Sequence, residues 1–336
     1  MHLHQGTDFL DKKIMSKTWI GIDAKNALFR FGYANKTLRT SDGKPTGAIH
    51  GILKTLLRLK HRYPTARFSM VWDGTNGSAW RKAICPEYKS NRKPNEDDVV
   101  RKSVFAQIAP LKRLLDTLKV PNFEIDGIEA DDLLSICGQY AIDNGHLAVV
   151  YSGDKDFYQL ICRGFTVVTK VAKGEGLHEV TKGDVWRAFK CPEEDVVKVR
   201  AIAGDSSDHI APTVHLIGPV KAARLVKAGA NPELKSFSDH ASGIYDEIKK
   251  LEDAWEKVHA NYRVMKLPTT YQLRRFSAYQ QQAIQECCNE AIGKALYVNY
   301  KRVLDQLREL ELNGLIADRF GLCSLQKGID NGAVTG

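Results

Sequence analysis

The sequence contains little that would suit a membrane or an oxidising compartment. No stretch approaches the ~20 apolar residues that a membrane-spanning helix needs. The seven cysteines form no CxxC pair and no regular framework, and Cys287 and Cys288 are adjacent. This spacing suits neither a simple structural disulfide nor a zinc knuckle. We therefore expect reduced thiols in a cytoplasmic protein without a membrane partner.

The first residues do not resemble a secretory leader, and no internal repeat is expected. The polar segment 1–16 carries acidic residues, unlike a signal peptide, and predicts a flexible N-terminal arm. No self-similarity at solenoid spacing is evident. At the other end, a segment that finishes in glycine and small polar residues predicts a C-terminal tail over 311–336.

What is present is enough apolar sequence for a full core and an excess of positive charge. The 336 residues are 43% apolar, which fits one large domain or two modest ones. Lys and Arg number 49 against 40 acids, giving a formal net charge of +9. This excess favours an anionic partner by long-range attraction, although a basic balance also serves solubility alone.

Short apolar runs alternate with helical patterns through the first half of the chain. They predict strands over Trp19–Ile22, Phe68–Trp72, Phe123–Ile125 and Leu147–Tyr151, and helices over Thr46–Tyr63, Phe105–Leu118 and Glu129–Asn144. This order favours an α/β core over 17–190 with a mainly parallel central sheet flanked by helices. Helical patterns then dominate, over Lys182–Phe189, Glu193–Ala203, Lys221–Ala228 and Ser242–Val258, and predict a helical region over 191–310.

Three of the predicted strands lead into an aspartate. These residues are Asp23, Asp73 and Asp154. In open α/β sheets, ligands bind beyond the carboxyl ends of the strands. The three carboxylates are therefore predicted to converge on one edge of the sheet. Stability of the fold alone would not require three aspartates to meet there.

Further acids occur in short clusters. The clusters are Glu129, Asp131 and Asp132, then Asp154 and Asp156, then Asp205 and Asp208. Ordinary helix capping would explain one or two members of the first cluster. Gathered in one cleft, so many carboxylates would repel one another unless a cation held them. Sites rich in oxygen and poor in sulfur and histidine select hard cations such as Mg²⁺ or Mn²⁺, and two such ions suit phosphodiester hydrolysis.

In this order, the motifs resemble those of the 5′-nuclease family. The matching segments are Asp23 through Phe29-Arg30, Val71-Trp72-Asp73, Tyr88-Lys89-Ser90-Asn91-Arg92, Glu129-Ala130-Asp131-Asp132, Ser152-Gly153-Asp154-Lys155-Asp156 and Ala203-Gly204-Asp205-Ser206-Ser207-Asp208. The family includes the 5′-nuclease domain of bacterial DNA polymerase I, stand-alone bacteriophage 5′-exonucleases and cellular flap endonucleases. Without a polymerase-length extension, the chain looks more like the stand-alone phage enzymes.

The resemblance implies a PIN-like 5′-nuclease fold and two divalent metal ions. The implied ion is Mg²⁺, with Mn²⁺ as a substitute. The first metal site would use Asp23, Asp73, Glu129, Asp131 and Asp132, and the second would use Asp154, Asp156, Asp205 and Asp208. Sharing of Asp154 between the two sites stays open.

The basic segment 77–119 resembles the helical arch that covers the active site in this family. It carries ten basic residues and five acids, for which a solvated helix face is the plain alternative. The resemblance implies that Lys89 and Arg92 are catalytic, because they would contact the scissile phosphate and stabilise its developing charge. Tyr88 would stack on a base near the cut, unless it is a packed tyrosine. Arg81 and Lys93 are further candidates for DNA contact.

A second DNA-binding element is expected near 208–224. The run Ile217-Gly218-Pro219-Val220-Lys221 looks like the turn of a helix-hairpin-helix-type module, which offers backbone N–H groups to duplex phosphates. Gly218 and Lys221 are its DNA-binding candidates. The module often binds K⁺ in the family, but the segment before the turn departs here from the family pattern and is one residue longer. Binding of K⁺ therefore stays open.

We expect a structure-selective 5′-nuclease of DNA replication or repair, acting as a monomer on 5′ flaps, 5′ overhangs and free 5′ ends. For a bacteriophage protein the compartment would be the host cytoplasm. One alternative is a DNA-binding protein that has lost its chemistry. A ribonuclease of the PIN-like fold would lack the helical half, but cleavage of RNA–DNA hybrids such as RNA primers stays open. A phosphatase is disfavoured, because no aspartate lies two residues after Asp23.

Overall fold

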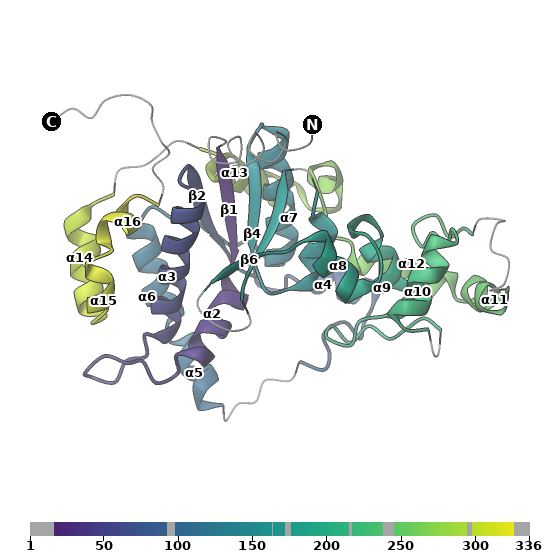
Figure 1. The fold of residues 1–336 in the computed structure, drawn as a ribbon, viewed down its shortest axis with the longest axis horizontal. Helices are drawn as coiled ribbons and strands as arrows, with labels where there is room; N and C mark the ends of the chain where they lie inside the picture. Colours follow the sequence, from purple (N-terminus) through teal and green to yellow (C-terminus); the bar gives the residue numbers. More distant parts are fainter. Residues whose placement is uncertain are drawn as a thin grey trace, which may run out of the picture.

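A six-stranded sheet forms the centre of the molecule (Figure 1). The computed structural model describes residues 17–92, 98–162, 164–171, 176–214, 217–237, 245–293 and 298–325. The strands are β1 (Thr18–Asp23), β2 (Ala66–Val71), β3 (Asn122–Phe123), β4 (Leu147–Tyr151), β5 (Phe165–Lys170) and β6 (Leu177–Glu179). Their order is β3-β2-β1-β4-β5-β6, and every neighbouring pair is parallel except β5 and β6. The predicted α/β fold with a mainly parallel sheet is confirmed.

Side chains of the central strands alternate between two hydrophobic cores, one on each face of the sheet. Along β1, Trp19 belongs to one core, whereas Ile20 and Ile22 belong to the other. The Trp19 face is covered by α7 (Ala130–Asp143), against which α13 (Ala278–Ala291) packs. The opposite face is covered by α2 (Ala24–Ala34), α3 (Gly47–Arg62) and α6 (Ile108–Thr117). Because both faces are buried, the central strands are continuous apolar runs rather than alternating ones.

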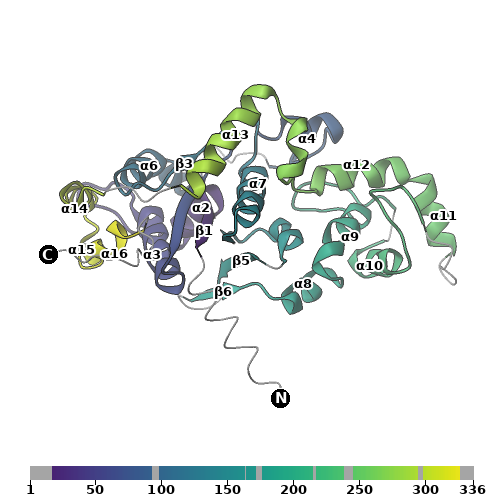
Figure 2. The same cartoon turned by 90° about the horizontal axis from the view of Figure 1, so that it is seen from above.

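The helical half of the chain extends to one side of the sheet (Figures 1 and 2). It contains α8 (Lys182–Phe189), α9 (Val196–Ala203), α10 (Pro219–Lys227), α11 (Tyr245–Asp253) and α12 (Trp255–Met265). The single helix predicted over 242–258 is wrong, because Ala254 separates α11 from α12 with a φ of −108° and a ψ of 6°. No helix in the described part of the chain is long and apolar enough to cross a membrane.

The last described helices return to the other side of the sheet. They are α14 (Tyr300–Glu309), α15 (Asn313–Ile316) and α16 (Arg319–Cys323), of which α14 packs on α6 and α16 on α3 (Figure 2). The predicted N-terminal arm 1–16 and residues 326–336 of the predicted tail lie outside the described residues. The division of the chain at residues 190 and 310 stays a prediction.

Candidate active site

The carboxyl ends of β1, β2 and β4 bring three aspartates to one groove. Asp23 is the last residue of β1, Asp73 comes shortly after β2, and Asp154 comes shortly after β4. All three line the same groove, together with Glu129 and Asp131. The convergence expected from the strand ends is therefore present, because parallel strands deliver their carboxyl ends to one edge.

Asp23 is held in place because it ends β1 and directly precedes the first residue of α2. It caps α2, with Oδ1 accepting the backbone N–H of Asn26 at 3.0 Å, and its Oδ2 accepts the Ser152 hydroxyl at 2.8 Å. Burial raises the pKa of Asp23 to about 6, although both hydrogen bonds act to lower it. The carboxylate is thus held in place at an energetic cost that a nearby cation would reduce.

Asp73 connects the end of β2 to the start of α7. Its Oδ1 accepts the N–H of Ala130 at 3.0 Å, and its Oδ2 lies 3.1 Å from the ammonium of Lys25. Burial acts to raise the pKa of Asp73, but Lys25 and the Ala130 N–H outweigh it and lower the pKa overall. Asp73 is therefore an ionised carboxylate that already has a cationic partner.

The first turn of α7 carries acids that point in two directions. Glu129 and Asp131 line the groove, whereas Asp132 is fully buried behind it and accepts a hydrogen bond from Trp80 Nε1 at 3.1 Å. Burial raises the pKa of Asp131, and the neighbouring carboxylates raise it further, against the pull of Arg81. Glu129 occupies the N-cap position without a side-chain capping bond, so helix capping does not explain this cluster.

Arg81 is a buried counter-ion for the same acids. It comes from α4 (Ala79–Ile84) and is 1% exposed. Its Nη2 lies 2.6 Å from Asp132 Oδ1, its Nη1 contacts Glu129, and its Nε donates to Val264 O at 2.9 Å. This burial contradicts the DNA contact predicted for Arg81, since a guanidinium enclosed by protein offers no face to a phosphate.

A second group of carboxylates lines the adjoining groove, where Arg200 of α9 separates Asp156 from Asp205. Arg200 Nη1 lies 2.7 Å from Asp156 Oδ1, and Nη2 contacts Asp205. Burial acts to raise the pKa of Asp205, but Arg200 lowers it overall. Sequence reasoning missed Arg200, although an arginine within the apolar run Val196–Ala203, just before Asp205, was a usable signal.

Asp154 joins the two groups of carboxylates. It lines both grooves, as do Asn26 and Arg92. Partial burial raises the pKa of Asp154 to about 7, and the charges of Asp156 and Asp23 act in the same direction. This position is what a carboxylate shared between two cation sites would require.

The two predicted phosphate-binding side chains face these carboxylates. Lys89 Nζ lies 2.6 Å from Glu129 Oε1, and Arg92 Nη2 lies 2.5 Å from Asp208 Oδ1. Both basic residues line the first groove. Asp208 is 7% exposed, and burial raises its pKa although Lys89 opposes the shift. Positive charge therefore stands opposite the acids, within reach of any anion that enters the groove.

The remaining arch candidates differ in position. Tyr88 is 2% exposed, and its ring lies 4.7 Å from the ammonium of Lys89. The structure favours the packed-tyrosine alternative over stacking on a base, because a ring so enclosed by protein has no open face to offer. Lys93 lies outside the described residues.

The predicted hairpin turn borders the second groove. Gly218 is the N-cap of α10, and Pro219, its first residue, lines that groove beside Asp205. Lys221 is exposed in the first turn of α10. Residues 215 and 216 lie outside the described chain, so the K⁺ expected of this module stays a prediction.

The carboxylates of the two grooves are the kind of ligand that a hard cation prefers, although they are not yet arranged around a single point. Within the described ranges, no three His, Cys, Asp or Glu side chains already converge as metal ligands. Basic side chains stand between the acids instead, including Lys25, which sequence reasoning also missed. All candidate ligands are carboxylate oxygens, which prefer Mg²⁺, Mn²⁺ or Ca²⁺ to softer ions.

An open, mainly parallel sheet with clustered carboxylates at its carboxyl edge, opposite lysine and arginine, defines an α/β protein equipped for phosphate chemistry. Residues 18–190 match the family model described as the 5′-3′ exonuclease, N-terminal resolvase-like domain. The chain belongs to this family, as the motifs of its sequence indicated.

Two relatives and one solved structure are similar to the chain. It is 24% identical to a 5′-3′ exonuclease of Aquifex aeolicus over 90% of this chain and 95% of that protein. It is 29% identical to DNA polymerase I of Pseudomonas aeruginosa over 75% of this chain, but it spans only 27% of the polymerase. The fold matches a structure of T5 5′-exonuclease with bound zinc ions, with a TM-score of 0.64, 20% identity, and coverage of 82% of this chain and 98% of that one.

Proposed function

We propose that this protein is a structure-selective, divalent-metal-dependent 5′-nuclease that hydrolyses DNA phosphodiesters at 5′ ends and flap junctions. One observation carries the proposal. Two groups of carboxylates meet at Asp154, and Lys89 and Arg92 face them across the same groove. Membership of the 5′-3′ exonuclease family supports it.

The carboxylates would hold the metal ions in two groups. Asp23, Asp73, Glu129 and Asp131 line the first groove, Asp156 and Asp205 line the second, and Asp154 lines both. Asp132 and Asp208, which the resemblance assigned to the metal ions, are buried and paired with Arg81 and Arg92, so we propose that they support these ligands instead. Bound there, divalent ions would supply an activated water and neutralise charge on the scissile phosphate. We propose Mg²⁺ as the natural ion, with Mn²⁺ as a substitute.

The protein's own groups would bind and orient the DNA. Lys89 and Arg92 would exchange their carboxylate partners for oxygens of the scissile phosphate, where preorganised positive charge stabilises the transition state. The turn at Gly218 and Lys221 would hold the duplex by its backbone, without reading bases. The arch expected within 77–119 would come from the part before α6 and cover the 5′ strand, because α6 itself packs in the core against the sheet. The products would carry a 5′-phosphate and a 3′-hydroxyl.

Cleavage of a 5′-labelled flap duplex, compared with a blunt duplex and an RNA–DNA hybrid, tests the proposal. Each substrate is incubated with Mg²⁺, with Mn²⁺ and with chelator, and product lengths are read on a gel. Metal-dependent cuts near the flap junction are expected. Tight DNA binding without cleavage under either metal would overturn the proposal in favour of a DNA-binding protein. Cutting of the hybrid alone would favour removal of RNA primers.

A further inference from the structure

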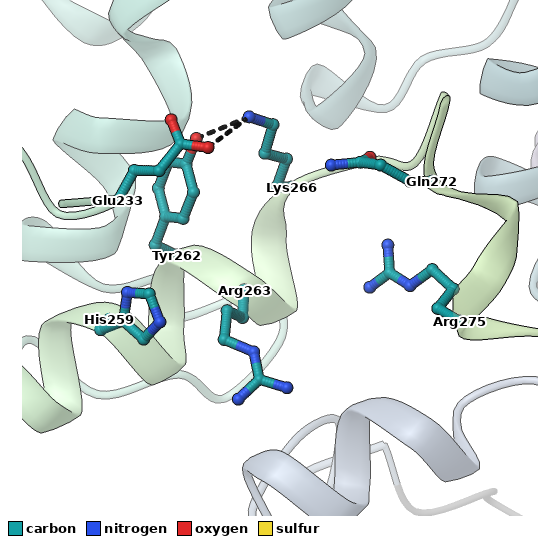
Figure 3. A pocket seen from close by; sticks show the side chains of 7 residues that line it. All are labelled: Glu233, His259, Tyr262, Arg263, Lys266, Gln272 and Arg275. Carbon is teal, nitrogen blue, oxygen red and sulfur yellow. Dashed lines mark hydrogen bonds and ion pairs between the residues drawn. The ribbon is translucent and has the colours of Figure 1, made fainter. Parts of the chain in front are cut away.

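A basic pocket lies outside the carboxylate grooves, between α12 and η3 (Thr270–Arg275) (Figure 3). Arg263 and Lys266 reach it from the end of α12, and Arg275 reaches it from η3. The metal binding and phosphate contacts proposed above do not involve these three residues. The pocket therefore needs an explanation of its own.

Two of its three basic side chains lack an acidic partner. Lys266 Nζ lies 3.3 Å from Glu233 Oε1 and donates to the hydroxyl of Tyr262 at 2.7 Å, as the dashed lines in Figure 3 mark. Across the described part of the chain, no carboxylate lies within 4.0 Å of the guanidinium of Arg263 or Arg275. The pocket consequently carries an excess of two positive charges.

Arg275 stacks on the ring of Trp80. Its Cζ lies 4.0 Å from the centroid of the Trp80 ring, and Trp80 is bonded to the buried Asp132. Partial burial lowers the pKa of Arg275, and the guanidiniums of Arg81 and Arg263 lower it further, against the opposing charge of Asp132. Trp80 thus contacts both Arg275 of the pocket and the buried Asp132 behind the first groove. A guanidinium held over an aromatic ring and without a carboxylate within 4.0 Å in the described part of the chain is available to an external anion.

We propose that this pocket binds backbone phosphates of the DNA substrate at a distance from the cut. The inference rests on the proposed function, because it assumes that DNA is the substrate. Arg263 and Arg275 would each present a planar fork of N–H donors, which suits phosphate oxygens. Tyr271 comes directly before the lining residue Gln272 on η3 and is 80% exposed, so it offers an aromatic surface that a nucleic acid can use and a free phosphate ion cannot.

The test compares the salt dependence of duplex binding, measured by fluorescence anisotropy of a labelled flap duplex in chelator. The variants are Arg263→Ala/Arg275→Ala and a matched control, Arg113→Ala/Arg302→Ala. The control also removes two exposed arginines that line a pocket, in this case near α6 and α14. The slope of log K against log salt should fall by about 1.8 in the first variant, or about 0.9 for each phosphate that is no longer neutralised, and stay unchanged in the control. Arg263→Lys/Arg275→Lys should keep most of the slope, because it keeps the charge.

Each outcome decides between the two proposals. An unchanged slope in the Arg263/Arg275 variant, with normal binding and cutting by the parent protein, would overturn the pocket assignment alone. An equal fall in the control would show a nonspecific charge effect and would also overturn it. Failure of the parent protein to bind the duplex would instead count against the nuclease function. If the variant lost binding to poly-glutamate but kept its DNA slope, the pocket would be a site for an acidic protein.

Discussion

The ammonium of Lys89 lies 2.6 Å from the carboxylate of Glu129. The side chain proposed to contact the scissile phosphate is therefore held by a side chain proposed to bind metal. Burial acts to lower the pKa of Lys89, but the charges of Asp131 and Glu129 outweigh it and raise the pKa overall. Lys89 is consequently a permanent positive charge, suited to electrostatic stabilisation and unsuited to proton transfer near neutral pH.

Replacing Lys89 tests this role directly. Lys89→Ala should slow the single-turnover cleavage of a flap duplex by about 100- to 1000-fold, the usual cost of about 2.7–4 kcal/mol for one preorganised donor. Binding of the same duplex should weaken far less, because the charge acts chiefly in the transition state. Lys301→Ala, at an exposed lysine of α14 on the other side of the sheet, serves as the control and should change neither quantity. A loss of affinity alone would make Lys89 a binding residue.

The proposed metal ligands should separate cutting from binding. Asp154→Ala or Asp205→Ala should reduce cleavage by more than about 100-fold, since bound metal supplies several kcal/mol of transition-state stabilisation. Duplex affinity in chelator should stay the same or improve, because each change removes a negative charge from the groove. The exposed Asp318 provides a matched Asp318→Ala control. Near-normal cleavage by either variant would contradict the assignment of these residues to two metal sites.

Arg200 should make stability depend on metal. Its side chain is 8% exposed between Asp156 at 13% and Asp205 at 12%. Arg200→Gln leaves these carboxylates without their cation, and removing one partner of a buried ion pair typically costs about 3–5 kcal/mol of unfolding free energy. Thermal melting in chelator should show the loss, and Mn²⁺ should restore part of it. Equal melting of the variant and the parent protein in chelator would contradict this role.

Sequence patterns predicted the site best where backbone geometry decides it. The strand β4 and the helix α8 have the predicted bounds, and Asp23, Asp73 and Asp154 meet because parallel strands end together. Helix α2 was not predicted, since it follows β1 without a loop and its first residue comes directly after Asp23.

The partners of the acids could not be predicted in the same way. A basic side chain has the same sequence signature whether it faces solvent or a buried carboxylate, so Arg81 was assigned to DNA and Arg200 was overlooked. Only the packing of α4 against α12, and of α9 against α10 and α12, decides which arginine is enclosed. The break at Ala254 is similar, because helical periodicity continues through it in the sequence.

The acids with raised pKa values should make the effect of metal depend on pH. In the folded protein without metal, the pKa values of Asp23 and Asp154 rise to about 6 and about 7, above the ordinary value of 3.8. Between pH 4 and 7 the folded state therefore binds more protons than the unfolded state, so the free energy of unfolding falls as pH rises through this window. The stability that these two groups contribute is fully present below pH 4 and is lost as pH rises through 7. Asp73 and Asp205 have lowered pKa values, so their opposite contribution changes below this window.

Urea unfolding at pH 5.5 and pH 8, each in chelator and in Mn²⁺, measures this effect. Stability in chelator should be lower at pH 8, and the gain on adding Mn²⁺ should be larger there, because metal binds the ionised carboxylates that are costly without it. Asp154→Asn should reduce both differences, since it removes the group that titrates highest in the pair. The exposed acid Asp318 again supplies the control, because Asp318→Asn should keep them. A Mn²⁺ effect of equal size at both pH values would mean that the metal binds elsewhere or that these carboxylates are already ionised at pH 5.5.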